Sequence, residues 1–388
     1  MTNVLIVFGT RPEAIKMAPL VKVFQKYSDL FNTKVCVTAQ HREMLDQVLD
    51  FFDIIPDFDL DLMKPGQNLY ALTSDIITSM KPILEDFKPD YVFVHGDTTT
   101  SMAGSIASFY SGAKVCHVEA GLRTHNKLSP FPEEINRQIV GRICDYHFAP
   151  TSTSKSNLLK ENIKEDTILV TGNTVIDALL YSVERVNKEP SKLIKDIEVI
   201  LGDKEMILVT GHRRENHGEG FISICEALKT IALDNTNRLI VYPVHLNPKV
   251  QEPVKRILTE VDNILLIDPL AYQDFIWMMN RSKIIITDSG GVQEEAPSLG
   301  KPVLVMRDIT ERPEAVDVGT VILVGTDKDL IVREALDLLN NENRFKMMST
   351  LHNPYGDGKA SFRIIDFIAQ KEGKIIPRET LVKQNKSK

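Results

Sequence analysis

The sequence places a Ser-Gly-Gly triplet, Ser289-Gly290-Gly291, directly after an apolar run that has the length of a buried strand. A turn of this kind at the start of a helix leaves several backbone N–H groups bare, and such groups bind phosphate. Glu294 and Glu295 follow within one turn, beside the place where an anion is expected. A nucleoside diphosphate meets both conditions, because amides hold its phosphates while a carboxylate accepts hydrogen bonds from its ribose hydroxyls. We assign that second role to Glu295.

Cationic side chains follow two other predicted strands. Near the N-terminus, Arg11 and Lys16 lie at the expected start of a helix, where both can point toward one anion. This turn lacks the GxGxxG pattern, so the dinucleotide-binding fingerprint is absent, and a solvated basic helix end is the alternative interpretation. Later, His212, Arg213 and Arg214 stand together after the run MILVTG. Three potential cations at one strand end of a chain with a net charge of −7 favour an anion site.

Carboxylates gather at strand and helix ends in the first half of the chain. Asp97 follows YVFVHG and Glu119 follows KVCHV, whereas Glu133 and Glu134 come behind two prolines at a helix start. A charged residue directly after a buried strand is unfavourable unless it is paired or functional. Local alternatives stay open, since Asp97 suits a helix cap and the two glutamates suit the positive end of a helix dipole. The pattern indicates a sugar facing acids and bases from the first half and a nucleotide held by the second half.

The elements that position these residues are apolar strands alternating with amphipathic helices. The runs that read as buried strands are VLIVF, KVCVTA, YVFVHG, KVCHVEA, YHFAPT, MILVTG, LIVYPVH, ILLIDP, KIIITDSG, KPVLVM and VILVG. We therefore predict an α/β protein with two doubly wound, Rossmann-like domains. The first is predicted to contain residues 1–171 plus 359–388, and the second residues 172–358. Ligands of such sheets bind beyond the carboxyl ends of the strands, which is where the candidate residues stand.

Composition narrows the functional class. The chain has 388 residues, of which 43% are hydrophobic and 26% charged, as in ordinary globular proteins. The net charge of −7 argues against binding to nucleic acid or to an anionic membrane. Four scattered cysteines without CxxC spacing suggest neither a zinc site nor a disulfide framework. The N-terminal apolar run is too short for a signal peptide or a spanning helix, so we expect a cytoplasmic protein without a metal.

Motifs along most of the chain resemble those of one enzyme family, the bacterial non-hydrolysing UDP-N-acetylglucosamine 2-epimerases. They are FGTRPEAIKMAPL, VTAQHREMLDQVL, VHGDTTT, HVEAGLRT, PEEINRQ, TGNTVIDAL, TGHRREN, YPVHLNP, TDSGGVQEEAPSLGKPVLV, ERPEAV and NPYGDG, spread between about residues 3 and 368. The resemblance implies a glycosyltransferase-B-like fold with the active site in the interdomain cleft. It implies interconversion of UDP-N-acetylglucosamine and UDP-N-acetylmannosamine for surface polysaccharide synthesis. Homodimers are usual in the family, and neither NAD nor any other cofactor is expected.

The resemblance also assigns individual residues. Residues that match the family's catalytic groups are Asp97, Glu119, Glu133 and His212. Residues that match its substrate-binding groups are Arg11, Lys16, Asp97, Glu119, His212, Leu270, Phe275, Ser289, Gly290, Gly291, Glu295 and Arg312. Residues that match a second-substrate regulatory pocket are Gln40, Glu133, Arg213 and His245. The family reaction is elimination of UDP to 2-acetamidoglucal followed by re-addition, and three carboxylates can serve both faces of C2 in it.

Particular roles and departures follow from the same resemblance. His212 corresponds to the histidine that contacts the departing diphosphate, and Phe275 to a residue near the uracil. Leu270 stands where some relatives have glutamine beside the base, so that contact is expected through the backbone. In the regulatory pocket, Glu43 and Gly66 replace a glutamine and an arginine, which puts substrate activation in doubt.

Three other functions fit parts of the pattern. A glycosyltransferase of the same architecture would need one acid or base rather than three carboxylates. A hydrolysing epimerase would release free N-acetylmannosamine and UDP. A nucleotide-sugar sensor would bind without turnover.

Overall fold

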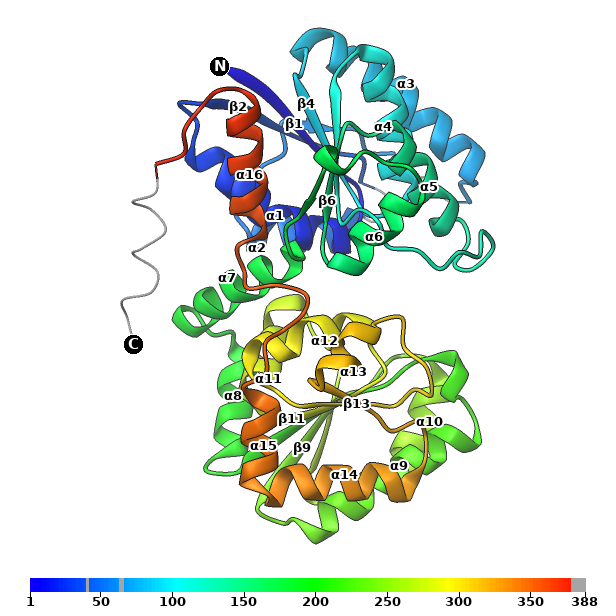
Figure 1. Ribbon diagram of the computed structural model, residues 1–388. Helices are drawn as coiled ribbons and strands as arrows, with labels where there is room; N and C mark the ends of the chain where they lie inside the picture. Colours follow the sequence, from blue (N-terminus) through cyan, green and yellow to red (C-terminus); the bar gives the residue numbers. More distant parts are fainter. Residues whose placement is uncertain (40–41, 63–65, 378–388) are drawn as a thin grey trace. The chain divides into compact units, whose positions relative to one another are not determined.

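The computed structural model describes residues 1–39, 42–62 and 66–377, which form two compact units (Figure 1). The first unit contains the chain up to Ala178 together with the residues from Gly356 onward, and the second contains Leu179–Tyr355. Helix α7 (Thr174–Lys188) begins in the first unit and continues in the second. The sequence-based domain boundaries, after residue 171 and before residue 359, remain a prediction.

The first unit is built on a seven-stranded parallel sheet with the strand order β3-β2-β1-β4-β5-β6-β7. Its strands are β1 (Thr2–Phe8), β2 (Phe31–Val37), β3 (Phe58–Asp59), β4 (Tyr91–His95), β5 (Lys114–Val118), β6 (Tyr146–Ala149) and β7 (Ile168–Val170). Its helical elements are α1 (Arg11–Lys26), α2 (Arg42–Phe51), α3 (Leu69–Phe87), α4 (Thr99–Ser111), α5 (Glu133–Ile143), α6 (Ser152–Lys160), η1 (Glu165–Thr167), the start of α7, and α16 (Ala360–Lys371). The central strands are buried on both faces, which explains their continuous apolar runs.

The C-terminal helix completes the first unit. Helix α16 lies against α1 and β6, far from it in sequence (Figure 1). Phe367 of α16 makes edge contacts with Tyr146 and Phe148 of β6, with ring centroids 5.2 Å and 5.6 Å apart. Burial of these rings covers a face of the sheet that would otherwise meet solvent.

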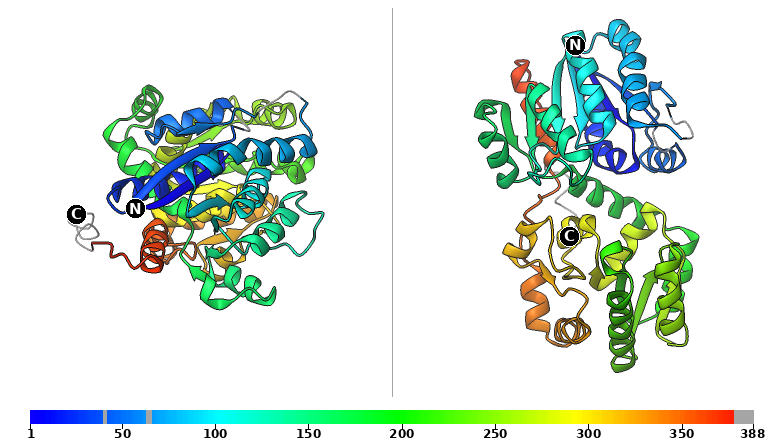
Figure 2. Two further views of the ribbon diagram at one scale, coloured as in Figure 1. Left: turned by 90° about the horizontal axis from the view of Figure 1, so that it is seen from above. Right: turned by 90° about the vertical axis from the view of Figure 1, so that its right-hand side faces the viewer.

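The second unit has a six-stranded parallel sheet with the order β10-β9-β8-β11-β12-β13, and helices cover both of its faces (Figure 2). Its strands are β8 (Glu205–Thr210), β9 (Arg238–Pro243), β10 (Ile264–Ile267), β11 (Ser282–Thr287), β12 (Val303–Val305) and β13 (Val321–Leu323). Its helical elements are the rest of α7, α8 (Lys192–Leu201), η2 (Arg214–Asn216), α9 (Glu219–Asp234), α10 (Pro248–Leu258), α11 (Tyr272–Arg281), α12 (Gly290–Glu295), η3 (Ala296–Leu299), α13 (Pro313–Val318), α14 (Lys328–Asn340) and α15 (Glu342–Ser349).

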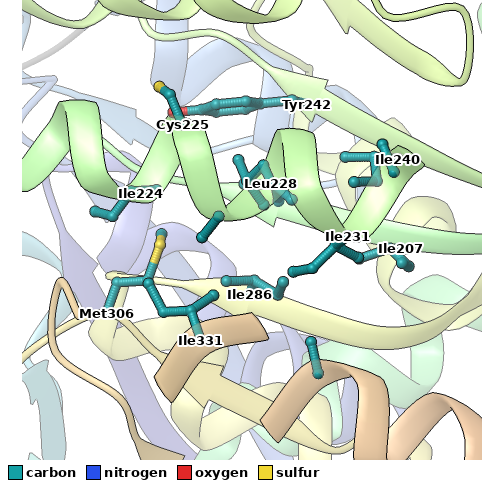
Figure 3. Close-up of a cluster of buried hydrophobic side chains, with 14 of the residues drawn as sticks. Ile207, Ile224, Cys225, Leu228, Ile231, Ile240, Tyr242, Ile286, Met306 and Ile331 are labelled. Atoms are coloured by element: carbon teal, nitrogen blue, oxygen red, sulfur yellow. The ribbon is translucent and has the colours of Figure 1, made fainter. Parts of the chain in front are cut away.

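One hydrophobic core cluster of the second unit lies between its sheet and helices α9 and α14. Ile207 and Ile286 project from adjacent strands toward Leu228 and Ile231 of α9, and Ile331 of α14 closes the same cluster (Figure 3). All five side chains are fully buried. Each contributes roughly 1.5–3 kcal/mol of hydrophobic free energy relative to exposure.

Strand order fixes where a ligand of either sheet would bind. The order reverses between β1 and β4 in the first sheet and between β8 and β11 in the second. Neighbouring loops diverge at such a point, so that a crevice opens beyond the carboxyl ends of the strands. The loops at these ends carry Asp97 after β4, His212 after β8 and Ser289 after β11. The predicted fold class of two doubly wound parallel sheets is therefore confirmed. In the described part of the chain, no helix is long and apolar enough to cross a membrane.

Candidate active site

Glu119 is the centre of a buried polar cluster in the first unit. It follows β5 with a backbone φ of 63°, a left-handed conformation that non-glycine residues seldom adopt. Its Oε2 accepts a hydrogen bond from the ammonium of Lys16, in α1, and a second from the Asn173 amide at 2.9 Å. His95 Nε2 lies 3.5 Å from the same oxygen without forming a hydrogen bond.

These partners decide the charge of Glu119. Burial of the carboxyl alone would raise its pKa, but Lys16 and then His95 outweigh that effect. The pKa of Glu119 therefore lies well below its ordinary range, and the group is an anion at neutral pH. Such a carboxylate can accept a proton or stabilise positive charge, and it is poorly suited to donate a proton. The alternative that Lys16 belongs to a solvated helix end is wrong.

Asp97 is held by the first turns of helix α5. Its Oδ2 accepts from Arg137 Nε at 2.9 Å and lies 2.6 Å from Nη2 of the same guanidinium. Its backbone carbonyl accepts from the Asn136 side chain at 2.8 Å. Thr98, not Asp97, caps α4, since the Thr98 hydroxyl accepts from the Ser101 N–H. The local alternative of a capping role for Asp97 is thereby excluded.

The two glutamates at the start of α5 differ in their surroundings. Glu134 is fully buried, and its carboxylate accepts hydrogen bonds from the Thr124 N–H and from Arg137 Nη1. Burial by itself would raise the pKa of Glu134, but these hydrogen bonds, with one from Gln138, hold it below the usual range. Oε2 of Glu133 is also buried, and it accepts no hydrogen bond from the described residues. Glu134 is therefore fixed by its partners within the protein, whereas Oε2 of Glu133 has no donor among the described residues.

Glu13, a carboxylate that the sequence analysis did not select, connects the loop after β1 with the loop after β4. Glu13 is 2% exposed, and its Oε2 accepts from the N–H groups of Gly9 and Thr10 at 3.0 Å and 2.8 Å. Its Oε1 accepts from the hydroxyls of Thr98 and Ser101 at 2.6 Å and 3.1 Å. Glu13 thus fixes the Asp97 loop to the start of α1. The capping-box spacing from Thr10 to Glu13 was a visible signal, but its distant partners were not.

Three further residues near the carboxylates escaped the sequence reasoning. Arg137 lies one helical turn after Glu133, on the helix that the glutamates begin. Asn173 lies in the TGNTVIDAL motif, and His95 is the last residue of β4. Helical spacing could have indicated Arg137, whereas contacts across neighbouring strands carry no local signal. Arg11, which was predicted, lies exposed in the first turn of α1.

In the second unit, the loop after β8 folds around a buried aspartate. Asp288, directly after β11, is fully buried, and its Oδ2 accepts from the N–H groups of His212 and Arg213 at 2.8 Å each. The imidazole of His212 stacks on that of His245, with ring centroids 5.3 Å apart. His212 and His245 therefore lie side by side at one edge of the sheet, and Arg213 follows His212 in the same loop.

The Ser-Gly-Gly turn carries an arginine above it. Gly290 and Gly291 begin α12, and a Cβ at Gly290 would come within 3.0 Å of the guanidinium carbon of Arg312. Glu294 Oε1 accepts from Arg312 Nε at 2.8 Å. A Cβ at Gly291 would lie 3.4 Å from Oε1 of Glu295, so this carboxylate flanks the turn. The two neighbouring glutamates thus differ: Glu294 balances the arginine, and Glu295 is a partly exposed acceptor.

The remaining predicted residues are placed as follows. Ser289 occupies the N-cap position of α12, although its hydroxyl makes no capping hydrogen bond. Leu270 and Phe275, both partly buried, lie just before and within α11, which contacts η3 directly after α12. Gln40 lies outside the described residues. Of the two departures, Glu43 lies in α2, and Gly66 is in a turn with a φ of 71°. Among the described residues, no group of three or more His, Cys, Asp or Glu side chains is arranged to bind a metal.

Comparison with known proteins identifies related sequences. Residues 25–369 match the model of the UDP-N-acetylglucosamine 2-epimerase family. The UDP-N-acetylglucosamine 2-epimerase of Escherichia coli K12 is 60% identical over 367 residues, covering 94% of this chain and 97% of that protein. The crystal structure of the UDP-GlcNAc 2-epimerase of Neisseria meningitidis bound to UDP-GlcNAc has a TM-score of 0.83 at 50% identity, covering 95% of this chain and all of that one. A putative UDP-N-acetylglucosamine 2-epimerase from Listeria monocytogenes has a TM-score of 0.90 at 48% identity, covering 97% and 99%.

Proposed function

The chain belongs to the UDP-N-acetylglucosamine 2-epimerase family, and from that premise we propose that it interconverts UDP-N-acetylglucosamine and UDP-N-acetylmannosamine. The relative from Neisseria meningitidis has been crystallised with UDP-GlcNAc, which supports the same substrate here. The observation that carries the proposal is the pair of anchored carboxylates at the carboxyl ends of β4 and β5. Asp97 is ion-paired with Arg137, and Glu119 with Lys16.

The proposed reaction inverts C2 by elimination and re-addition. The C1–O bond to UDP breaks with its electron pair going to the diphosphate, a carboxylate takes the C2 proton, and 2-acetamidoglucal remains. A proton then returns to the opposite face of C2 as UDP adds back to C1. Because the C2–H lacks an adjacent carbonyl, C1–O cleavage should lead, and the developing oxocarbenium charge would be stabilised by nearby anions.

The carboxylates of the first unit fit this division of tasks. Asp97 and Glu119 are supplied with cationic partners, so both are suited to stabilise positive charge on the sugar or to accept its proton. Glu133 presents an acceptor with no hydrogen bond from the described residues. The three are proposed to share protons as a coupled set. Arg11 and Lys16 are proposed to meet the diphosphate, which requires the Lys16 ammonium to leave Glu119.

The second unit is proposed to hold the nucleotide. The amides of Gly290 and Gly291, with Arg312 above them, are suited to the diphosphate. Ser289 begins the same turn, with its N–H donating to the Thr287 hydroxyl at 3.0 Å, and its side chain is proposed to contact the same group. His212 would face the departing oxygen.

The rest of the nucleotide is assigned to two other side chains and one backbone. Glu295 would accept from the ribose hydroxyls. Phe275 would lie near the uracil, and Leu270 would contact the base through its backbone. No cofactor takes part in the proposed scheme.

A deuterium incubation tests the proposal. UDP-N-acetylglucosamine alone in deuterated water should give UDP-N-acetylmannosamine with deuterium at C2. No exchange without an acceptor would favour a glycosyltransferase. Free N-acetylmannosamine as the final product would favour the hydrolysing type. Tight binding without any turnover would favour a nucleotide-sugar sensor.

A regulatory site for a second substrate molecule remains a separate proposal. Gln40, Glu133, Arg213 and His245 match such a pocket in the family, whereas Glu43 departs from it. A sigmoidal dependence of rate on UDP-N-acetylglucosamine would support the site. A hyperbolic dependence would contradict it.

We further propose a homodimer that works in the cytoplasm and supplies surface polysaccharide synthesis. Family membership supports all three statements. Sedimentation equilibrium at micromolar concentration tests the first, since a monomer mass would contradict it.

A further inference from the structure

Asp288 has one satisfied oxygen and one unsatisfied oxygen, although its side chain is fully buried. Oδ2 accepts the backbone N–H groups of His212 and Arg213. Oδ1 accepts no hydrogen bond from any described residue. A buried acceptor without a donor destabilises the folded state, and more so when the group is charged. The position of Oδ1 therefore needs a physical explanation.

A candidate donor to Oδ1 is the imidazole of His212. Its Nδ1 lies 3.5 Å from Oδ1, too far for a hydrogen bond but within reach of a small rotation. The imidazole side chain is 46% exposed, so one edge faces the buried carboxylate while the other remains open to a ligand. The stacked ring of His245, inclined by 14°, limits how His212 can turn.

We propose that Asp288 is a positioning residue for His212, with Oδ1 accepting the Nδ1–H so that Nε2 faces the departing diphosphate. The inference rests on the proposed function, because it gives His212 its orientation toward the leaving UDP. The carboxylate fixes the tautomer and stabilises the imidazolium, and it does not itself take the proton. The contact shortens when an anion binds at Nε2, as hydrogen bonds in catalytic groups commonly do on ligand binding.

The charges around the ring support this arrangement. Two titratable side chains that lie beside His212 are Asp288 and His245. Tyr242 donates to the Gly211 carbonyl at 3.2 Å, and burial raises the pKa of Tyr242 well above its ordinary value, so it stays neutral. Asp288 is thus the anion beside the imidazole. In the imidazolium form of His212 both ring nitrogens carry hydrogen, so Nε2–H can donate to the diphosphate oxygen that receives the electron pair of the C1–O bond. In the reverse step the same hydrogen bond is released as that oxygen adds back to C1.

A double-mutant cycle separates positioning from loop support. Asp288→Asn should lower kcat by about tenfold to a hundredfold, the scale of lost outer-shell partners, with a much smaller change in KM. In the His212→Gln background the same substitution should lower kcat by less than about threefold, since its target is gone. The matched control is Thr210→Val, which removes a hydroxyl bonded to Thr287 at 2.5 Å without touching the ring. The fold-reduction in kcat caused by Thr210→Val should multiply with the fold-reduction caused by His212→Gln.

Fully multiplicative effects of Asp288→Asn and His212→Gln would overturn the proposal. Should Asp288→Asn fail to fold, nitrogen-15 spectra of the wild-type histidines give the answer. The neutral His212 ring, assigned by its loss in His212→Gln, should carry its hydrogen on Nδ1, and the Nε2–H tautomer would contradict the inference. Failure of the proposed function is distinguishable, because an inactive wild-type protein would still show the tautomer and bind UDP.

Discussion

His117 makes the stability of the first unit dependent on pH. His117 lies in β5 and is 1% exposed. Its Nε2 donates to the backbone carbonyl of Gly96, the residue directly before Asp97, at 2.7 Å. Its Nδ1 is buried and has no hydrogen-bond partner among the described residues, so a proton added there would find no acceptor. Burial lowers the pKa of His117 from 6.5 to about 3.

The sign of the effect follows from proton uptake. Below pH 6.5 the unfolded chain protonates this histidine while the folded chain does not, so stability is fully present above that pH and is lost as pH falls toward 3. At pH 5, which is 1.5 pH units below the ordinary pKa, this single group lowers the free energy of unfolding by about 2 kcal/mol, because each pH unit corresponds to about 1.36 kcal/mol. His147 contributes in the same direction, because burial also lowers its pKa.

The substitution His117→Gln isolates the contribution, since glutamine keeps an N–H donor but does not titrate. Hydrogen exchange of the β4 and β5 amides, corrected for intrinsic rates, gives the opening free energy at pH 7.5 and pH 5. Between pH 7.5 and pH 5 the opening free energy of the wild type should fall by about 2 kcal/mol more than that of His117→Gln. The control is His125→Gln at an exposed position, which should follow the wild type. An equal loss in wild type and His117→Gln would refute the reasoning.

Three further predictions concern the candidate site. Asp97→Asn should lower turnover by at least roughly a hundredfold, measured as C2 deuterium exchange, and unchanged turnover would remove Asp97 from the mechanism. Arg137→Met leaves the partly exposed Asp97 and the fully buried Glu134 without their cation, so the free energy of unfolding in urea should fall by about 3 kcal/mol and turnover should drop with it. The exposed Arg142→Met on the same helix is the control and should change neither. Gly290→Ala places a methyl group against the guanidinium of Arg312, and calorimetry should show UDP binding weakened by about tenfold, or 1.4 kcal/mol, whereas unaltered affinity would contradict the phosphate role of this turn.

The sequence was sufficient for the sheets because their strands are buried on both faces. A run such as VLIVF has no polar residue to place at a surface, and the structure shows Val4–Phe8 within the parallel strand β1. Strand ends then located the candidate loops, since ligands of parallel sheets bind there. The two-residue strand β3 was missed, because a segment that short has no periodicity.

Side-chain partners were beyond the same reasoning. Lys16 and Glu119 are 103 positions apart, and only the adjacency of β1, β4 and β5 brings them together. Glu294 and Glu295 are neighbours in sequence but point about 100° apart on a helix, so one meets Arg312 and the other flanks the glycine turn. Composition gave no means of telling these two glutamates apart.

The left-handed backbone at Glu119 has a consequence for how variants of this protein should be judged. Glycine would relax that conformation by roughly 1–2 kcal/mol, so relief of backbone strain alone would favour it. The same change removes the anion to which Lys16 and Asn173 donate, and the loss of that partner opposes the gain. Melting temperature at this position therefore reports two opposing effects, and variants of Glu119 should be scored by turnover first.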